Sequence, residues 1–351
     1  MSGTLSQMPS RQRGVILIMA LLVVALVTTI VVSVSWRFSL DMARNENRWH
    51  GSQARAYMEG GEQLARKVLW EDRVETGDID HLGEMWALSG DPLPTDEGWI
   101  RGIIEDAHGR FNLNLLVRPQ QGGRNNERNK DPWDVLIESQ RRFVRLLQTI
   151  ELEDGPVTYQ KAMELVDAIQ DWLDPDDQVT GFGGAEADYY RDQDPPYPIT
   201  NGPMTSVSEL SLIKGMTPEL YEKLLPLVVV LPYGEMMNIN TLKDPILRSL
   251  NRKINPEPLS EAEWEALKED RAAATEGFRQ VADFVNAPNA AAILGGGEFD
   301  QSDLVTSSRY FILISETLVG EQVRRSKTLL YRGNMNGVDH VHIVRRTDSN
   351  F

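Results

Sequence analysis

Residues 13–36 read R-G-V-I-L-I-M-A-L-L-V-V-A-L-V-T-T-I-V-V-S-V-S-W, and Arg13 is the only charged side chain among them. At ~1.5 Å of rise per residue, a helix over this apolar run spans roughly 30 Å, the thickness of a bilayer core. Trp36 ends the run and Arg37 follows, as expected of residues at a membrane interface. The stretch therefore predicts a single transmembrane helix over 15–36.

The residues before this run predict its orientation and its processing. Residues 1–14 are polar and carry two charges, on Arg11 and Arg13. Basic flanks stay in the cytoplasm, so the rest of the chain is expected outside it. A cleaved secretory signal has a shorter apolar run followed by a small residue, whereas Gly14 precedes the run here. Two interpretations remain, a plain membrane anchor and a signal cut after Gly14, which would make Val15 the first mature residue.

The junction itself favours the second interpretation. The string R-Q-R-G at 11–14, followed by V-I-L-I-M-A-L-L at 15–22, resembles the leader junction of type IV prepilins. That resemblance implies cleavage by a prepilin peptidase and methylation of the new N-terminus. Most pilin-like subunits carry Glu at the fifth mature position, a costly carboxylate in the bilayer that pairs with a neighbouring subunit's amine. Met19 stands there instead, which implies a subunit with nothing above it, at the tip of a fibre.

Composition limits the classes of function for the whole chain. The 351 residues suggest about two domains plus appendages. The net charge of −16, from 36 Lys and Arg against 52 Asp and Glu, disfavours nucleic acid and suits cations or basic partner surfaces. Cysteine is absent, which excludes disulfide frameworks, thiolate catalysis and cysteine-ligated zinc.

The pattern after the membrane run predicts that the helix continues. Apolar residues recur at helical spacing with charged residues between them: Phe38, Met42, Trp49, Ala56, Tyr57, Leu64 and Val68. We expect one long amphipathic helix, half in lipid and half packed on a domain. The pair Gly60 and Gly61 predicts a kink or a point of close packing, and a kink is the commoner meaning.

The remaining chain alternates between strand and helix patterns. Two apolar, β-branched runs at 99–105 and 110–117 flank the turn sequence D-A-H-G and predict a hairpin. Residues 118–130 are almost free of apolar side chains and predict an exposed linker. Further helices are expected at 133–152, 159–173, 206–225 and 261–271, and strands at 310–318, 324–331 and 340–345.

This order predicts an α+β fold in which a long pilin-like N-terminal helix packs on an antiparallel sheet and a large all-α domain is inserted between the strands. The expected divisions are a leader at 1–14, a transmembrane helix at 15–36, the helix continuation and hairpin at 37–117, a linker at 118–130, the inserted helical domain at 131–297 and the C-terminal strands at 298–351.

Carboxylates are densest in D-W-L-D-P-D-D at 171–177 and in E-A-D-Y-Y at 186–190, with a glycine-rich loop between them. A helix C-terminus disfavours negative charge, so the cluster must be solvated or neutralised by a cation. Oxygen ligands on a flexible loop suit Ca²⁺, although the spacing is not that of an EF-hand. A solvated acidic loop is an equally good interpretation, and a catalytic pair is disfavoured because no second motif supplies a nucleophile. The candidate ligands are Asp171, Asp174, Asp176, Asp177, Glu186 and Asp188.

A second motif lies at 206–226, where capping residues and Gly215 predict two short helices joined by a glycine turn. This resembles a helix-hairpin-helix, whose turn binds DNA phosphates through backbone N–H groups. Only Lys214 lies near the turn, with acidic residues flanking it, so a packing role is favoured. His340 and His342 share one face of an expected strand, but no third metal ligand is evident.

Five strings in order resemble the K-type minor pseudopilin family of the type II secretion system: R-G-V-I-L-I-M-A-L-L at 13–22, D-A-H-G-R-F-N-L-N at 106–114, the paired acidic strings at 171–177 and 183–190, P-M-T-S-V-S-E-L-S-L-I-K-G-M-T-P-E-L-Y at 203–221, and N-I-N-T-L at 238–242. The resemblance implies a non-enzymatic subunit of the bacterial inner membrane, with its large domain in the periplasm and calcium in the helical insert. It implies assembly with I-type and J-type minor pseudopilins at the tip of the pseudopilus, a fibre that exports folded proteins.

Two rival functions follow from the motifs taken singly. One is a membrane-anchored DNA-binding protein that uses the turn around Gly215. The other is a periplasmic hydrolase that uses the acidic cluster.

Overall fold

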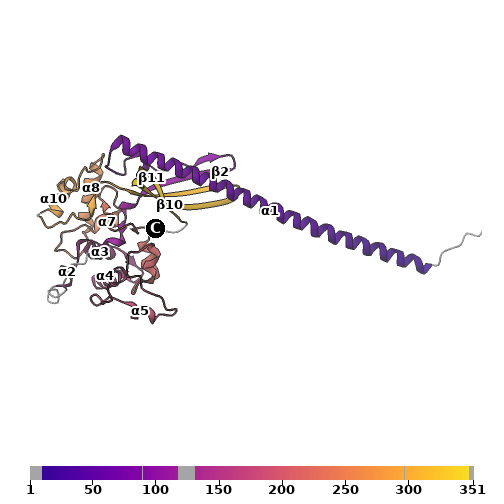
Figure 1. The fold of residues 1–351 in the computed structure, drawn as a ribbon, viewed down its shortest axis with the longest axis horizontal. Helices are drawn as coiled ribbons and strands as arrows, with labels where there is room; N and C mark the ends of the chain where they lie inside the picture. The colour runs from indigo at the N-terminus through magenta and orange to yellow at the C-terminus, as the bar shows by residue number, and fades with distance from the viewer. Residues whose placement is uncertain (1–9, 89, 118–130, 296, 348–351) are drawn as a thin grey trace, which may run out of the picture.

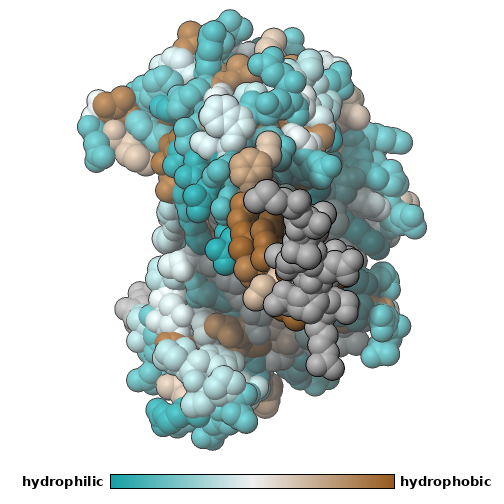
Figure 2. Space-filling model, turned by 90° about the vertical axis from the view of Figure 1, so that its right-hand side faces the viewer, coloured by the Kyte–Doolittle hydropathy of each residue, from teal (hydrophilic) through white to brown (hydrophobic). Residues whose placement is uncertain are grey.

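One helix dominates the computed structural model, which describes residues 10–88, 90–117, 131–295 and 297–347. Helix α1 (Ser10–Thr76) is uninterrupted over 67 residues, and its N-terminal half projects away from a compact head (Figure 1). Within the described residues, it is the one helix long and apolar enough to cross a membrane. Figure 2, viewed along this helix, shows its brown apolar surface in front of a largely hydrophilic head.

The C-terminal half of α1 packs on the head, as the amphipathic pattern predicts. The helix continues to Thr76, past the predicted pattern, and stays helical through Gly60 and Gly61. A Cβ atom at Gly61 would lie 3.3 Å from Cδ1 of Ile100, a side chain of the sheet. The glycine pair therefore serves close packing at Gly61 and does not interrupt the helix.

A five-stranded antiparallel sheet lies under α1, in the order β1-β2-β9-β10-β11. Its buried core against the helix includes Leu69 of α1 with Phe311, Leu313 and Leu330 of the sheet. The three predicted C-terminal strands are confirmed. The strands are β1 (Leu93–Thr95), β2 (Gly98–Asp106), β9 (Tyr310–Val319), β10 (Gln322–Met335) and β11 (Val338–Thr347).

The predicted hairpin over 99–105 and 110–117 is wrong. β2 pairs with β1 and β9, while β3 (Phe111–Asn112) pairs in parallel with β6 (Val228–Val229). The carboxylate of Asp106 accepts a hydrogen bond from the backbone N–H of His108, and the Asn112 side chain accepts one two residues onward in the same way. These local bonds turn the chain out of the sheet instead of back along it.

The segment between β2 and β9 forms the helical domain, which lies below the left end of the sheet in Figure 1. Helix α4 (Tyr159–Leu173) matches its predicted bounds. The other helices are α2 (Pro132–Val135), α3 (Glu138–Gln148), α5 (Ala187–Arg191), α6 (Pro218–Leu224), α7 (Asp244–Arg248), α8 (Glu261–Ala273), α9 (Val281–Val285) and α10 (Pro288–Leu294), with 3-10 turns η2 (Ala107–Gly109), η3 (Leu113–Leu116) and η5 (Val207–Leu212). A further 3-10 turn, η1 (Met85–Ala87), lies outside this domain, between α1 and β1. Two short strand pairs complete it: β4 (Glu151–Leu152) with β5 (Gly155–Pro156), and β7 (Met237–Asn238) with β8 (Leu304–Val305).

The insertion begins earlier than the sequence predicts. Phe111, Leu113 and Leu116 belong to the hydrophobic core of the helical domain, although the pattern assigned 37–117 to the sheet part. The core of the sheet part therefore gives way to the core of the helical domain just after η2. The predicted linker at 118–130 lies outside the described residues.

Buried charged side chains join α1 and the loop after it to the sheet. Arg332 of β10 donates hydrogen bonds to Asp72 of α1 (3.1 Å), to Asp80 and to the carbonyl oxygen of Ser308 (3.0 Å). Burial raises the pKa of the Asp80 carboxyl to about 7, even though Arg332 favours its ionised form. Earlier on α1, the Glu62 carboxylate is 4% exposed and accepts hydrogen bonds of 2.8 Å from Nε and Nη2 of Arg346.

Candidate functional site

The acidic loop is held on the last turns of α4. Asp167 and Asp171 lie one turn apart on this helix, and both accept hydrogen bonds from amides of the loop that follows. The backbone N–H of Thr180 lies 3.0 Å from Asp171, and those of Phe182 and Gly183 lie 3.2 Å from Asp167. The loop therefore folds back along α4 because two helix carboxylates satisfy its amides.

Two glycines permit this close approach. A Cβ atom at Gly183 would lie 2.2 Å from Cα of Glu164. A Cβ atom at Gly184 would lie 2.3 Å from Oδ2 of Asp171 and 2.4 Å from the carbonyl oxygen of Thr180. Only glycine fits at these distances, and the resulting path carries Glu186 back over the C-terminal end of α4.

Three of the predicted ligands converge at this place. Carboxylate oxygens of Asp174, Asp176 and Glu186 all lie within 4.8 Å of one another. Asp174 and Glu186 are each 7% exposed. Both oxygens of Glu186 and one of Asp174 are buried without a hydrogen-bond partner in the structure. Buried carboxylate oxygens without donors are costly, and a positive charge at this place would lower that cost.

The electrostatics of the cluster lead to the same conclusion. Burial, together with repulsion from Asp171 and Asp174, raises the pKa of Glu186 to about 7. Burial, with repulsion from Asp176 and Asp171, raises the pKa of Asp174 to about 6. Both groups resist ionisation near neutral pH, and a bound cation would reverse that preference.

The other predicted ligands lie apart from this group. Asp171 is fully buried and accepts from the Thr180 amide, so it holds the loop. Asp177 is exposed and accepts from Nδ2 of Asn201 at 3.2 Å. The Asp188 side chain is 93% exposed and pairs with Arg191 at 2.9 Å.

Sequence reasoning missed Asp167, which holds the loop together with Asp171. Its signal was its position one helical turn before Asp171, on the face that precedes a glycine-rich loop.

The motif at 206–226 that resembles a helix-hairpin-helix packs against the acidic loop. Ser206 and Thr217 cap its two helices, and Gly215 between them has a φ of +84°. Nζ of Lys214 donates to the carbonyl oxygen of Gly184 at 2.9 Å, and Nε1 of Trp172 donates to Glu209 at 3.0 Å. Lys214, the cation beside the glycine turn, is thus bonded to the acidic loop. This contact favours a packing role for the motif over phosphate binding.

Comparison with known proteins identifies the family. A family model for "Type II secretion system (T2SS), protein K" matches residues 109–233. The protein K of Pseudomonas aeruginosa is 34% identical over 92% of this chain and 89% of its own length. That of Aeromonas hydrophila is 35% identical over 67% of this chain and 70% of its own length. This chain belongs to the type II secretion system protein K family.

A solved structure shows the same protein K fold. The GspK–GspI–GspJ complex from the type 2 secretion system of enterotoxigenic Escherichia coli contains a chain that matches with a TM-score of 0.66 at 24% identity. The match covers 87% of this chain and 98% of that one. The predicted α+β fold, with its long helix, antiparallel sheet and helical insert, is confirmed.

The remaining candidate positions lie outside the acidic cluster. Val15 and Met19 are 57% and 66% exposed on the free half of α1, and no heavy atom lies within 4 Å of a Cβ placed at Gly14. His340 stacks on Trp70 with ring centroids 4.8 Å apart, and Nε2 of His342 lies 2.9 Å from a backbone carbonyl oxygen. The two histidines therefore have separate partners.

Proposed function

We propose that this chain is the minor pseudopilin that caps the tip of the periplasmic type II secretion pseudopilus and so supports fibre assembly and the export of folded proteins across the outer membrane. The observation that carries the proposal is the shape of the chain. One long helix with a bare apolar half bears a head enlarged by a helical insert (Figure 1). Such a head suits the end of a fibre, where no further subunit has to stack.

The membrane segment supports the same role. The fifth position after Gly14 is Met19, so the bilayer carboxylate that would dock the chain beneath another subunit is absent. Arg11 and Arg13 precede the apolar run, which supports an N-terminus in the cytoplasm and a head in the periplasm, anchored in the inner membrane. Prepilin peptidase would cut after Gly14, and Val15 would become the methylated first residue.

The partners proposed are I-type and J-type minor pseudopilins, together with the other pseudopilus subunits. This follows the solved relative, which was found in a complex with GspI and GspJ and shares the fold of this chain. Co-purification of the full chain with its I-type and J-type counterparts in mild detergent tests the assembly. Intact mass from cells with and without prepilin peptidase tests the processing, and a mature start other than Val15 would contradict it.

Calcium fits the acidic cluster. Asp174, Asp176 and Glu186 would hold the ion, because their oxygens lie together and those of Glu186 have no other partner. Carboxylate and carbonyl oxygens are the ligands that Ca²⁺ prefers, in sets of about six to eight. A bound ion would neutralise the cluster and fasten the start of α5 to the end of α4. Its role would be structural, since it would join two ends of the loop that Asp167 and Asp171 hold on α4.

A further inference from the structure

The sheet has a second face, on the side away from α1, that is only partly covered. Ile104 and Leu313 pack toward α1, so their neighbours in the strands point the opposite way. Strand register places two rows of side chains side by side on that opposite face, at the end of the sheet far from the insert. We call them the distal face: Trp99, Leu318 and Val323 in one row, and Arg101, Glu316 and Arg325 in the next.

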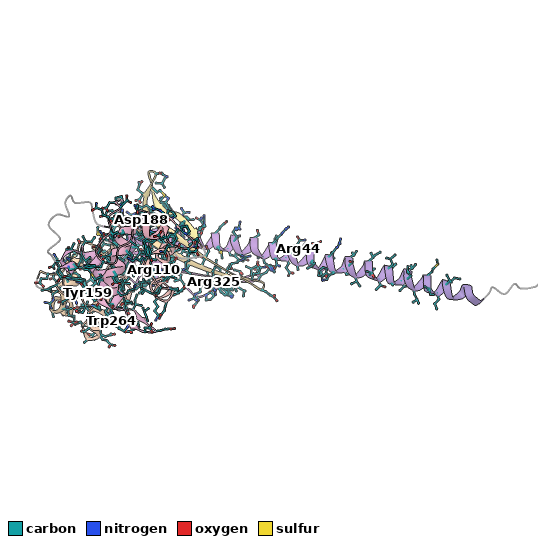
Figure 3. All side chains as sticks on the ribbon, turned by 90° about the horizontal axis from the view of Figure 1, so that it is seen from below. Arg44, Arg110, Tyr159, Asp188, Trp264 and Arg325 are labelled. Atoms are coloured by element: carbon teal, nitrogen blue, oxygen red, sulfur yellow. The ribbon has the colours of Figure 1, made fainter. Side chains whose placement is uncertain are left out.

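The described residues cover this end only in part. Near the insert the same face is buried, where Ile312 and Leu329 pack with Val229 and Leu231. On the distal face Val323 is 50% exposed, and Trp99 and Leu318 belong to none of the hydrophobic cores. Figure 3 shows this side from below, with Arg325 toward the place where α1 leaves the head and Arg110 nearer the insert.

The distal face is positively charged on an acidic chain. Glu316 lies between two arginines and pairs with Arg325 at 2.7 Å. Arg101 points from the other side, and its Nε is buried without a hydrogen-bond partner. Two arginines against one carboxylate leave the distal face positively charged on a chain with a net charge of −16, and such a surface is complementary to carboxylates.

The position of the distal face decides which neighbour it can meet. The turn between β9 and β10 lies beside α1, where Gln322 donates to Asn47 at 2.6 Å and the ring of His50 lies 2.7 Å from a Cβ placed at Gly320. This is the point where α1 departs toward the membrane (Figure 1). The distal face therefore lies at the membrane-proximal end of the head, on the side of the next subunit down the fibre.

We infer that the distal face is a docking surface for a carboxylate-bearing surface of the neighbouring minor pseudopilin. The partner's carboxylate would pair with Arg101, and its apolar side chains would cover Trp99, Leu318 and Val323. Buried arginine and tryptophan side chains are the residues that most often dominate binding energy at interfaces. The inference rests on the proposed function, because that function supplies the neighbour.

The test uses the full chain in mild detergent, with its full-length I-type and J-type counterparts as the binding partners. Arg325→Glu reverses a charge whose side chain is 76% exposed, and Val323→Ser removes apolar contact without changing charge. We expect Arg325→Glu to weaken binding about tenfold at low salt and less at high salt. We expect Val323→Ser to weaken it at both salt concentrations, since hydrophobic contact is not screened.

Arg191→Glu is the matched control. Arg191 is an exposed arginine paired with a carboxylate, as Arg325 is, but it lies on α5 of the insert. Its reversal should leave binding unchanged. Wild-type affinity in both distal-face variants would overturn the inference and leave the proposed function standing. Loss of self-association in place of loss of partner binding would assign the face to a second copy of this chain and overturn it too. No binding by the wild type would refute the proposed function itself.

Discussion

Replacing Glu186 with glutamine should stabilise the protein when calcium is absent. The side chain is 7% exposed, and its oxygens have no donor, so the carboxylate is ionised at a cost. Its pKa is raised from 4.5 to about 7 by burial and by Asp171 and Asp174. A rise of that size corresponds to about 3 kcal/mol of unfolding free energy, at ~1.4 kcal/mol per pKa unit.

The stabilisation expected for this variant depends on pH. Because the folded-state pKa is raised, the cost is absent below about pH 4.5 and grows as pH rises toward about 7. Above that pH it is fully present. Glutamine cannot ionise, so the variant without calcium should be more stable than the wild type at pH 8, by up to about 3 kcal/mol. At pH 4.5 the two should be nearly equal.

Calcium should reverse the order. The ion binds ionised carboxylates, so it stabilises the wild type by roughly 4.1 kcal/mol at a thousand times its dissociation constant, which exceeds the advantage of the variant. The Glu186→Gln variant lacks a central ligand and should respond weakly. Urea unfolding followed by tryptophan fluorescence, with calcium or with chelator, measures both effects, and Trp172 on α4 reports locally.

Asp188→Asn is the matched control for this prediction. It makes the same change of acid to amide on a side chain that is 93% exposed and outside the cluster. It should alter neither the stability nor the calcium response. The reasoning is refuted if Glu186→Gln destabilises the calcium-free protein at pH 8, or if chelator leaves wild-type stability unchanged there.

Three further substitutions test other parts of the structure. Gly184→Ala places a Cβ 2.4 Å from a backbone oxygen, so we expect a loss of about 2 kcal/mol and of the calcium response; Gly202→Ala, whose Cβ has 3.7 Å of room, should be neutral by the same urea titration. Glu62→Ala leaves Arg346 and Thr328 without their shared partner and should cost about 1–3 kcal/mol, seen as earlier release of α1 in hydrogen exchange. Arg332→Met leaves Asp72 and Asp80 buried without their cation and should cost about 3–5 kcal/mol at pH 8. That last loss should shrink toward pH 5, where Asp80, with a pKa of about 7, is protonated; equal losses at both pH values would contradict the assignment.

Local features of the chain were predictable from the sequence. The bounds of α4 and the presence of two capped short helices over 206–225 depend on neighbours within a few residues, so the pattern alone predicts them. The three C-terminal strands were predictable because their side chains alternate in polarity, and in the structure they alternate between the two faces of the sheet.

Features that depend on distant partners were not predictable. Asp106 looked like part of a hairpin turn, but its carboxylate binds Asn238, Thr241 and Ser308, which only the fold brings near. The candidate ligands divided in the same way. Glu186 and Asp188 are two residues apart, yet one is buried in the cluster and the other points to solvent. Spacing does not show which carboxylate the loop carries inward, because that depends on Gly183 and Gly184 meeting α4.

The uninterrupted path of α1 has a mechanical consequence. A load applied along the axis of this helix meets no hinge before the head, and β9 and β10 run alongside it (Figure 1). The load would cross to the sheet through Glu62 and Asp72, which bind Arg346 and Arg332 on two different strands. The hydrogen bonds between strands lie across the direction of pull, so they would be sheared together and not peeled one at a time. Such an arrangement resists deformation along the helix axis, so the head and α1 would move as one rigid body.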